Sequence, residues 1–147
     1  MSSFDAYTRD QLRQSYTDAW KKRRAHSPLT ALEALIADVI ELHPEYQPML
    51  EQPERAAEFE APAGQSHDNP FLHLGLHLAV REQAAIDRPP GVRELLGLLQ
   101  ARRADLHEGE HELMQALAET LWEAQRAGRA PDEQHYLGLA RQRLPQR

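Results

Sequence analysis

Two pairs of histidines in this chain have the spacing that places both rings of a pair on one face of a helix. His73 and His77 lie in FLHLGLHLAVREQ, and His107 and His111 lie in DLHEGEHELMQ. Residues four apart are one helical turn apart, so both imidazoles of a pair project from the same side. Imidazole nitrogen is a good ligand for zinc, iron and nickel. Two such helices packed together would surround a divalent transition metal ion with four nitrogens.

Two glutamates and a further histidine extend this set. Glu82 and Glu110 fall within the apolar arcs of the two helices, and a buried carboxylate is costly unless it is paired or bound to a metal. They are reserve ligands or bases. His43 continues the apolar stripe of the preceding helix one turn beyond Val39. We therefore expect a metal site formed by some of seven residues: His43, His73, His77, Glu82, His107, Glu110 and His111.

These histidines also have explanations that need no metal. His73 and His77 share a stripe with arginines, a pattern equally typical of a polar helix face in water. His43 stands at the end of its helix, where a histidine complements the helix dipole, and Pro44 prevents a further turn. The sequence leaves both interpretations open.

Known catalytic motifs match this region only weakly. HEGEH, residues 107–111, fits the H-x-x-E-H pattern of inverted zinc proteases, but those enzymes use a further carboxylate ligand and a much larger domain. Glu108 and His111 fit the Glu-x-x-His element of di-iron bundles, but no second copy precedes His73 or His77. No catalytic residue is assigned, and whether the protein is an enzyme stays open. An open position on a bound ion would let metal-activated water support hydrolysis.

Composition and charge limit the classes of function. The chain has 147 residues, 41% of them hydrophobic, which fits one domain with a sizeable core. It has no cysteine, which excludes disulfides, iron–sulfur clusters and cysteine catalysis. Its formal net charge of -6 argues against general nucleic-acid binding, because phosphate affinity depends on basic charge. The basic run at residues 21–24 is a local exception at a helix end.

Nothing in the sequence indicates a membrane protein. No apolar run approaches the roughly 18 residues that a membrane span needs. The beginning, MSSFDAYTRDQL, lacks the basic and apolar regions of a signal peptide. We therefore expect a cytoplasmic protein whose partner is an unidentified protein or small molecule.

Helix signals occur along most of the chain. Thr30 with Glu33 forms a capping box, Asn69 and Pro70 start another helix, and Gly128 ends one. Asp105 either starts a new helix or lies within a longer one. Residues 52–68 predict a surface loop or flexible excursion. With no competing strand pattern, the sequence predicts an all-α domain over residues 1–147, a bundle of five or six helices.

Four segments together carry a resemblance to a known family. They are LHPEY at 42–46, NPFLHLGLHLAVREQ at 69–83, DRPPGVR at 87–93 and HEGEHELMQALAETLWEAQRAGRAPDE at 107–133. The chain resembles an uncharacterised bacterial family of short proteins that is known only as a domain of unknown function. This resemblance covers most of the chain and implies no activity.

A weaker resemblance is to hemerythrin-like and DinB-like helical bundles. Those proteins hold iron, zinc or nickel with histidines from different helices, often including an H-x3-H pair. His43, His107 and His111 match that arrangement, and His73 and His77 are additional. The leading hypothesis is a small metal-binding helical protein. The alternative is a metal-free module for protein–protein interaction or regulation.

Overall fold

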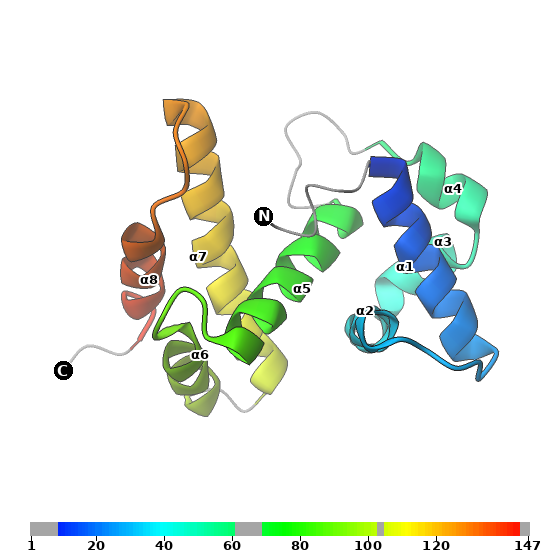
Figure 1. Cartoon of the computed structure of the whole chain (residues 1–147), viewed down its shortest axis with the longest axis horizontal. Helices are drawn as coiled ribbons and strands as arrows, with labels where there is room; N and C mark the ends of the chain where they lie inside the picture. Colours follow the sequence, from blue (N-terminus) through cyan, green and yellow to red (C-terminus); the bar gives the residue numbers. More distant parts are fainter. Residues whose placement is uncertain (1–8, 61–68, 103–104, 145–147) are drawn as a thin grey trace. The chain divides into compact units, whose positions relative to one another are not determined.

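The computed structural model describes residues 9–60, 69–102 and 105–144, which form eight α-helices and one 3-10 helix (Figure 1). Within these ranges the chain has no strand, which confirms the all-α class. The chain divides into two compact units, residues 1–74 and 75–147.

The first unit contains five complete helical elements and the beginning of a sixth. They are α1 (Arg9–Arg24), α2 (Ala31–Glu41), η2 (Pro44–Tyr46), α3 (Gln47–Leu50), α4 (Pro53–Glu58) and the first turn of α5 (Pro70–Ile86). Helix α1 packs against both α2 and α4. The buried apolar side chains of the unit are Tyr16, Ala19, Trp20, Ile36, Ala37, Val39, Ile40, Leu50, Ala56, Phe71 and Leu74.

The helix boundaries in this unit follow from local capping. Thr30 and Glu33 form the predicted capping box, with each side chain bonded to the other residue's backbone nitrogen. The Asn69 side chain accepts the backbone N–H of Phe71 at 3.0 Å, so α5 begins as predicted with Pro70 in its first turn.

Arg13 ties α4 to α1. Its side chain is buried, and its Nη1 donates to the carbonyl oxygens of Ala56 at 3.0 Å and Phe59 at 2.7 Å. The guanidinium also lies 4.3 Å from the centre of the Phe71 ring. One planar cation therefore satisfies the last carbonyls of α4 and covers an aromatic ring at the beginning of α5.

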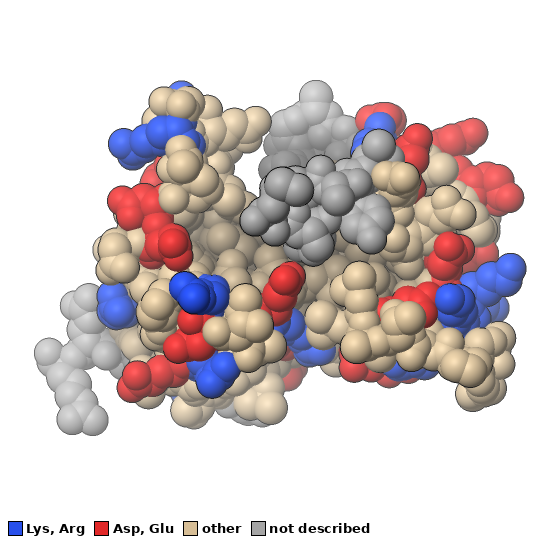
Figure 2. Space-filling view, viewed as in Figure 1, with Lys and Arg blue, Asp and Glu red and all other residues tan. Residues whose placement is uncertain are grey.

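The basic run at the end of α1 forms ion pairs within the unit. Lys22 pairs with Glu33, and Arg23 pairs with both Asp38 and Glu41. These contacts join α1 to α2 across the turn between them. Much of the positive charge of the run is therefore compensated by the chain itself. On the face shown in Figure 2, acidic and basic side chains likewise lie among each other.

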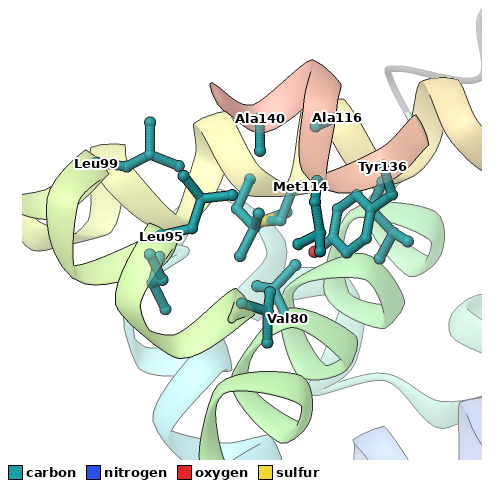
Figure 3. Packing of buried hydrophobic residues seen from close by; sticks show 12 residues of the cluster. Val80, Leu95, Leu99, Met114, Ala116, Tyr136 and Ala140 are labelled. Atoms are coloured by element: carbon teal, nitrogen blue, oxygen red, sulfur yellow. The ribbon is translucent and has the colours of Figure 1, made fainter. Parts of the chain in front are cut away.

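The second unit contains the remainder of α5 with α6 (Val92–Ala101), α7 (Leu106–Ala127) and α8 (Glu133–Arg141). Helix α7 packs against α6 and α8. Their apolar faces enclose one core, and Figure 3 draws part of it, with Val80 from α5, Leu95 from α6, Met114 from α7 and Tyr136 from α8. The buried members are Val80, Val92, Leu95, Leu96, Leu99, Leu113, Met114, Ala116, Leu117, Tyr136, Leu137 and Ala140.

The segment DRPPGVR forms the turn between α5 and α6. The Asp87 carboxylate accepts the backbone N–H groups of Gly91 at 3.2 Å and Arg93 at 3.1 Å. Gly91 has φ of 96°, a conformation that favours glycine. The Arg93 side chain donates to the carbonyls of Ala84 and Ala85 and so satisfies the end of α5. The residues of DRPPGVR are therefore explained by the turn that they form.

The prediction of five or six helices is wrong, because the described residues contain eight α-helices. The additional two are the short helices α3 and α4, each of which has proline in its first turn. Proline fits there because the first backbone N–H groups of a helix have no partner within it. Helix α4 lies within residues 52–68, where a loop was expected; residues 61–68 are outside the described part of the chain.

Two further expectations concern helix length. Asp105 starts a separate helix, since its side chain accepts the backbone N–H of His107 at 2.9 Å, and Gly128 ends that helix with φ of 65° as predicted. No helix in the described ranges combines the length and the apolar character that a membrane span requires.

Candidate metal centre

Three of the predicted histidines lie together in the second unit. One ring nitrogen from each of His77, His107 and His111 lies within 4.8 Å of the others. The ring centres of His107 and His111 are 4.0 Å apart, and that of His77 lies 4.8 Å from His107 and 5.8 Å from His111. A tetrahedral zinc ion, with Zn–N bonds of about 2.1 Å, separates its ligand atoms by about 3.4 Å. The limit of 4.8 Å exceeds that separation, so a bound ion would draw the three nitrogens closer together.

Two helices position these rings. His107 and His111 occupy successive turns at the beginning of α7, which the Asp105 cap places. His77 projects from α5, and its side chain is fully buried, with 0% exposure. The alternative explanation of the α5 pair was a polar helix face in water. That explanation is therefore wrong for His77. The i,i+4 spacing brought the α7 rings together as expected, and packing of α5 on α7 added the third ring.

Glu110 lies beside this cluster, and its charged group is buried. Its carboxylate is buried, and Oε1 lies 3.1 Å from His77 Nε2. Arg81 donates to the same carboxylate from Nε to Oε2 at 2.7 Å and from Nη2 to Oε1 at 3.0 Å. Burial by itself would raise the pKa of Glu110, but the hydrogen bonds and charges of His77 and Arg81 outweigh it and lower the pKa to about 2.

His111 is held in the form that metals bind. Burial lowers its pKa below the ordinary value of 6.5, and the nearby His77 lowers it further. A lowered pKa keeps the imidazole neutral at neutral pH, and only a neutral imidazole has a lone pair to donate to a metal.

His43 and His73 contact each other in the first unit. His43 Nδ1 lies 2.7 Å from the carbonyl oxygen of Val39, and its Nε2 lies 2.8 Å from His73 Nε2. The Val39 carbonyl can only accept, so His43 Nδ1 carries a proton. The Tyr46 ring stacks on His43, with the ring centres 5.2 Å apart. The Val39 contact lies at the end of α2, where the sequence placed His43, and it leaves both interpretations of this residue open.

The residues that the sequence predicted as metal ligands thus differ in their surroundings. His77, His107 and His111 come together, and Glu110 is an ion-pair partner beside them. Glu82 is exposed, so the expectation of a buried carboxylate at that position is wrong. The apolar character of α5 declines toward its end, where Ile86 is also exposed.

Sequence reasoning missed two residues that shape the site. Arg81 had been assigned to a polar stripe, yet it lies one turn after His77 and contacts the same carboxylate. Gly109 is buried within HEGEH, where α7 approaches α6 closely. A glycine inside a strong helical pattern was the available signal, because such a residue usually has a packing reason.

Comparisons with known proteins address the family of the chain. Searches of curated proteins and of solved structures found no significant match. The resemblance to hemerythrin-like and DinB-like bundles therefore stays a prediction. A family model described as "Domain of unknown function (DUF1841)" matches residues 8–142, nearly the whole chain and every histidine named above. The chain belongs to this DUF1841 family.

Proposed function

We propose that this protein binds a divalent transition metal ion through His77, His107 and His111. The observation that carries the proposal is the convergence of three ring nitrogens within 4.8 Å from two helices. Burying a polar ring is costly compared with an aliphatic side chain. His77 is buried, and a metal ion bound by all three ring nitrogens would stabilise this arrangement.

The ligand chemistry favours a borderline metal. All three donors are imidazole nitrogens, a set that suits zinc, iron and nickel better than magnesium or calcium, which prefer oxygen. The sequence also predicted His43, His73 and Glu82 as ligands, and these remain predictions. No reaction is proposed. The observed donors support metal binding whether the ion has a structural or a chemical role.

Metal content of the full, untagged chain is the direct test. Protein purified without chelators or added metal would be analysed by inductively coupled plasma mass spectrometry, together with a His107→Ala/His111→Ala variant. We expect near-stoichiometric metal in the parent and its loss in the variant. Adding the correct ion to metal-free protein at about 100 times its Kd should raise the thermal midpoint by about 5–10 °C.

His135→Ala is the matched control. His135 lies on α8 and pairs with Glu123 at the surface, so its removal deletes one histidine without touching the cluster. This variant should retain the parent's metal. Circular dichroism of each variant shows whether metal was lost from a folded chain.

Parent protein that contains no metal and gains no thermal stability from zinc, iron or nickel would overturn the proposal. The metal-free interaction module would then be the better account. Equal metal loss in the cluster and control variants would also contradict assignment of the ion to these histidines.

A further inference from the structure

Arg81, Glu110 and His77 form a continuous chain of contacts that ends at the histidine cluster. Arg81 and His77 are one turn apart on α5 and face the same carboxylate of α7. The guanidinium contacts both carboxylate oxygens, the planar two-point geometry that arginine forms with a carboxylate. Glu110 is therefore fixed from one side by a permanent cation.

The contacts among Arg81, Glu110 and His77 determine which ring nitrogen of His77 carries the proton. A carboxylate paired with arginine at two points is ionised and can only accept hydrogen bonds. The contact between Glu110 Oε1 and His77 Nε2 consequently requires a proton on Nε2. In the neutral ring, the lone pair then lies on Nδ1.

We propose that Glu110 is a positioning residue and not a ligand, and that His77 binds the metal ion through Nδ1. This inference rests on the proposed function, since it assigns how one of the three histidines ligates. Both oxygens of Glu110 already accept hydrogen bonds, Oε2 from Arg81 and Oε1 from Arg81 and His77, so the carboxylate is engaged in orienting these two side chains. Metal-binding histidines commonly donate their other ring N–H to a carboxylate, which orients the ring and increases its basicity.

Arg81 also determines the charge of the centre. The three imidazoles are neutral as ligands, and the negative charge of Glu110 is compensated by Arg81. These residues together therefore add no net charge that would neutralise a bound ion. Replacing Arg81 would leave Glu110 with a free oxygen and a negative charge close to the ion. That change favours direct carboxylate ligation.

Long-range ¹H–¹⁵N correlation spectra of the zinc-loaded, ¹⁵N-histidine-labelled chain test the assignment. The His77 signals would be identified by their absence in a His77→Asn variant. We expect His77 to carry its proton on Nε2 and to show the metal-bound shift at Nδ1. A metal-bound Nε2, or a proton on Nδ1, would overturn this inference while leaving metal binding intact. Absence of any zinc-dependent histidine shift would instead overturn the proposed function, and this inference with it.

Zinc affinity of the Glu110→Gln variant provides a second test. The glutamine keeps the shape but loses the charge that holds the His77 proton, and outer partners of this kind contribute about 10–100-fold to affinity. Glu119→Gln, an exposed change on the same helix with the same change in charge, should bind as the parent does. Glu110→Asp, which restores a carboxylate, should recover part of the affinity.

Affinity would be measured by competition with a chromogenic chelator on protein shown by circular dichroism to be folded. A folded Glu110→Gln variant with parental affinity and an unchanged Nδ1 signal would contradict the positioning role. Complete loss of zinc binding in both Glu110 variants, with the fold retained, would indicate that Glu110 is itself a ligand.

Discussion

Gly109 of α7 lies so close to Gln100 of α6 that the two backbones leave no room for a side chain. A β-carbon at residue 109 would be 2.8 Å from both the backbone nitrogen and the Cα of Gln100. The glycine within HEGEH thus sets the approach of the two helices at the turns that carry His107 and His111. Packing and the proposed metal ligation make separate demands on the same five residues.

Gly109→Ala should therefore destabilise the fold, although alanine favours helices. The methyl group meets backbone and not a flexible side chain, and forced overpacking of this kind costs about 1–3 kcal/mol. Gly97→Ala and Gly138→Ala are matched controls, because a β-carbon at either position meets nothing within 4 Å. These should stabilise by up to about 1 kcal/mol. Urea unfolding of the three variants tests the contrast, which equal effects would contradict.

Arg81→Met should destabilise the metal-free protein by about 2–3 kcal/mol. The variant leaves the buried Glu110 carboxylate without its cation, and breaking a buried pair from one side is costly. The partial exposure of Arg81 reduces this cost below that of a fully buried pair. Arg24→Met is the control, since its contact with Glu51 is longer, at 3.7 Å, and more exposed. It should change the free energy of unfolding by no more than about 0.5 kcal/mol.

A small effect of Arg81→Met, similar to that of Arg24→Met, would mean that water or another group satisfies Glu110. Both variants remove one positive charge, so the comparison also corrects for the change in net charge.

Acid should remove the contribution of Glu110 to stability. Because its pKa falls from an ordinary 4.5 to about 2 on folding, the ionised form stabilises the native state at pH values above 4.5. That contribution is lost progressively as the pH falls from 4.5 toward 2. In metal-free protein, the difference in unfolding free energy between the parent and Glu110→Gln should therefore decrease over this range. A difference that stays constant would contradict the lowered pKa.

Arg13→Met should loosen α4 in particular. It removes the donors to the carbonyls of Ala56 and Phe59 and the cation over Phe71. Hydrogen exchange of the α4 amides should accelerate by at least about 10-fold, which corresponds to about 1.4 kcal/mol of local stability. Arg13→Lys keeps the charge without the planar fork and should show an intermediate effect. Unchanged exchange in Arg13→Met would show that α4 is held by its apolar contacts alone.

The helices of this protein follow from local sequence signals, as particular residues show. Thr30, Asn69 and Asp105 act through side chains that reach backbone groups two or three residues away, so their effect is visible without any tertiary contact. The same is true of the α7 histidine pair, because one helical turn alone brings His107 and His111 together. The expected helix count did not include the short helices α3 and α4, each of which has proline in its first turn, where a helix accommodates it.

Contacts between helices determined the rest of the candidate site. The sequence could give neither the burial of His77 nor the exposure of Glu82, since both lie on α5 and only packing decides which face is covered. Arg81 and Glu110 are 29 residues apart in the chain. Their pairing depends on the register of α5 against α7, which no local pattern specifies. Sequence alone therefore determined which side chains have metal-binding chemistry, and tertiary packing decided that His77 joins His107 and His111 while Glu110 is engaged by Arg81.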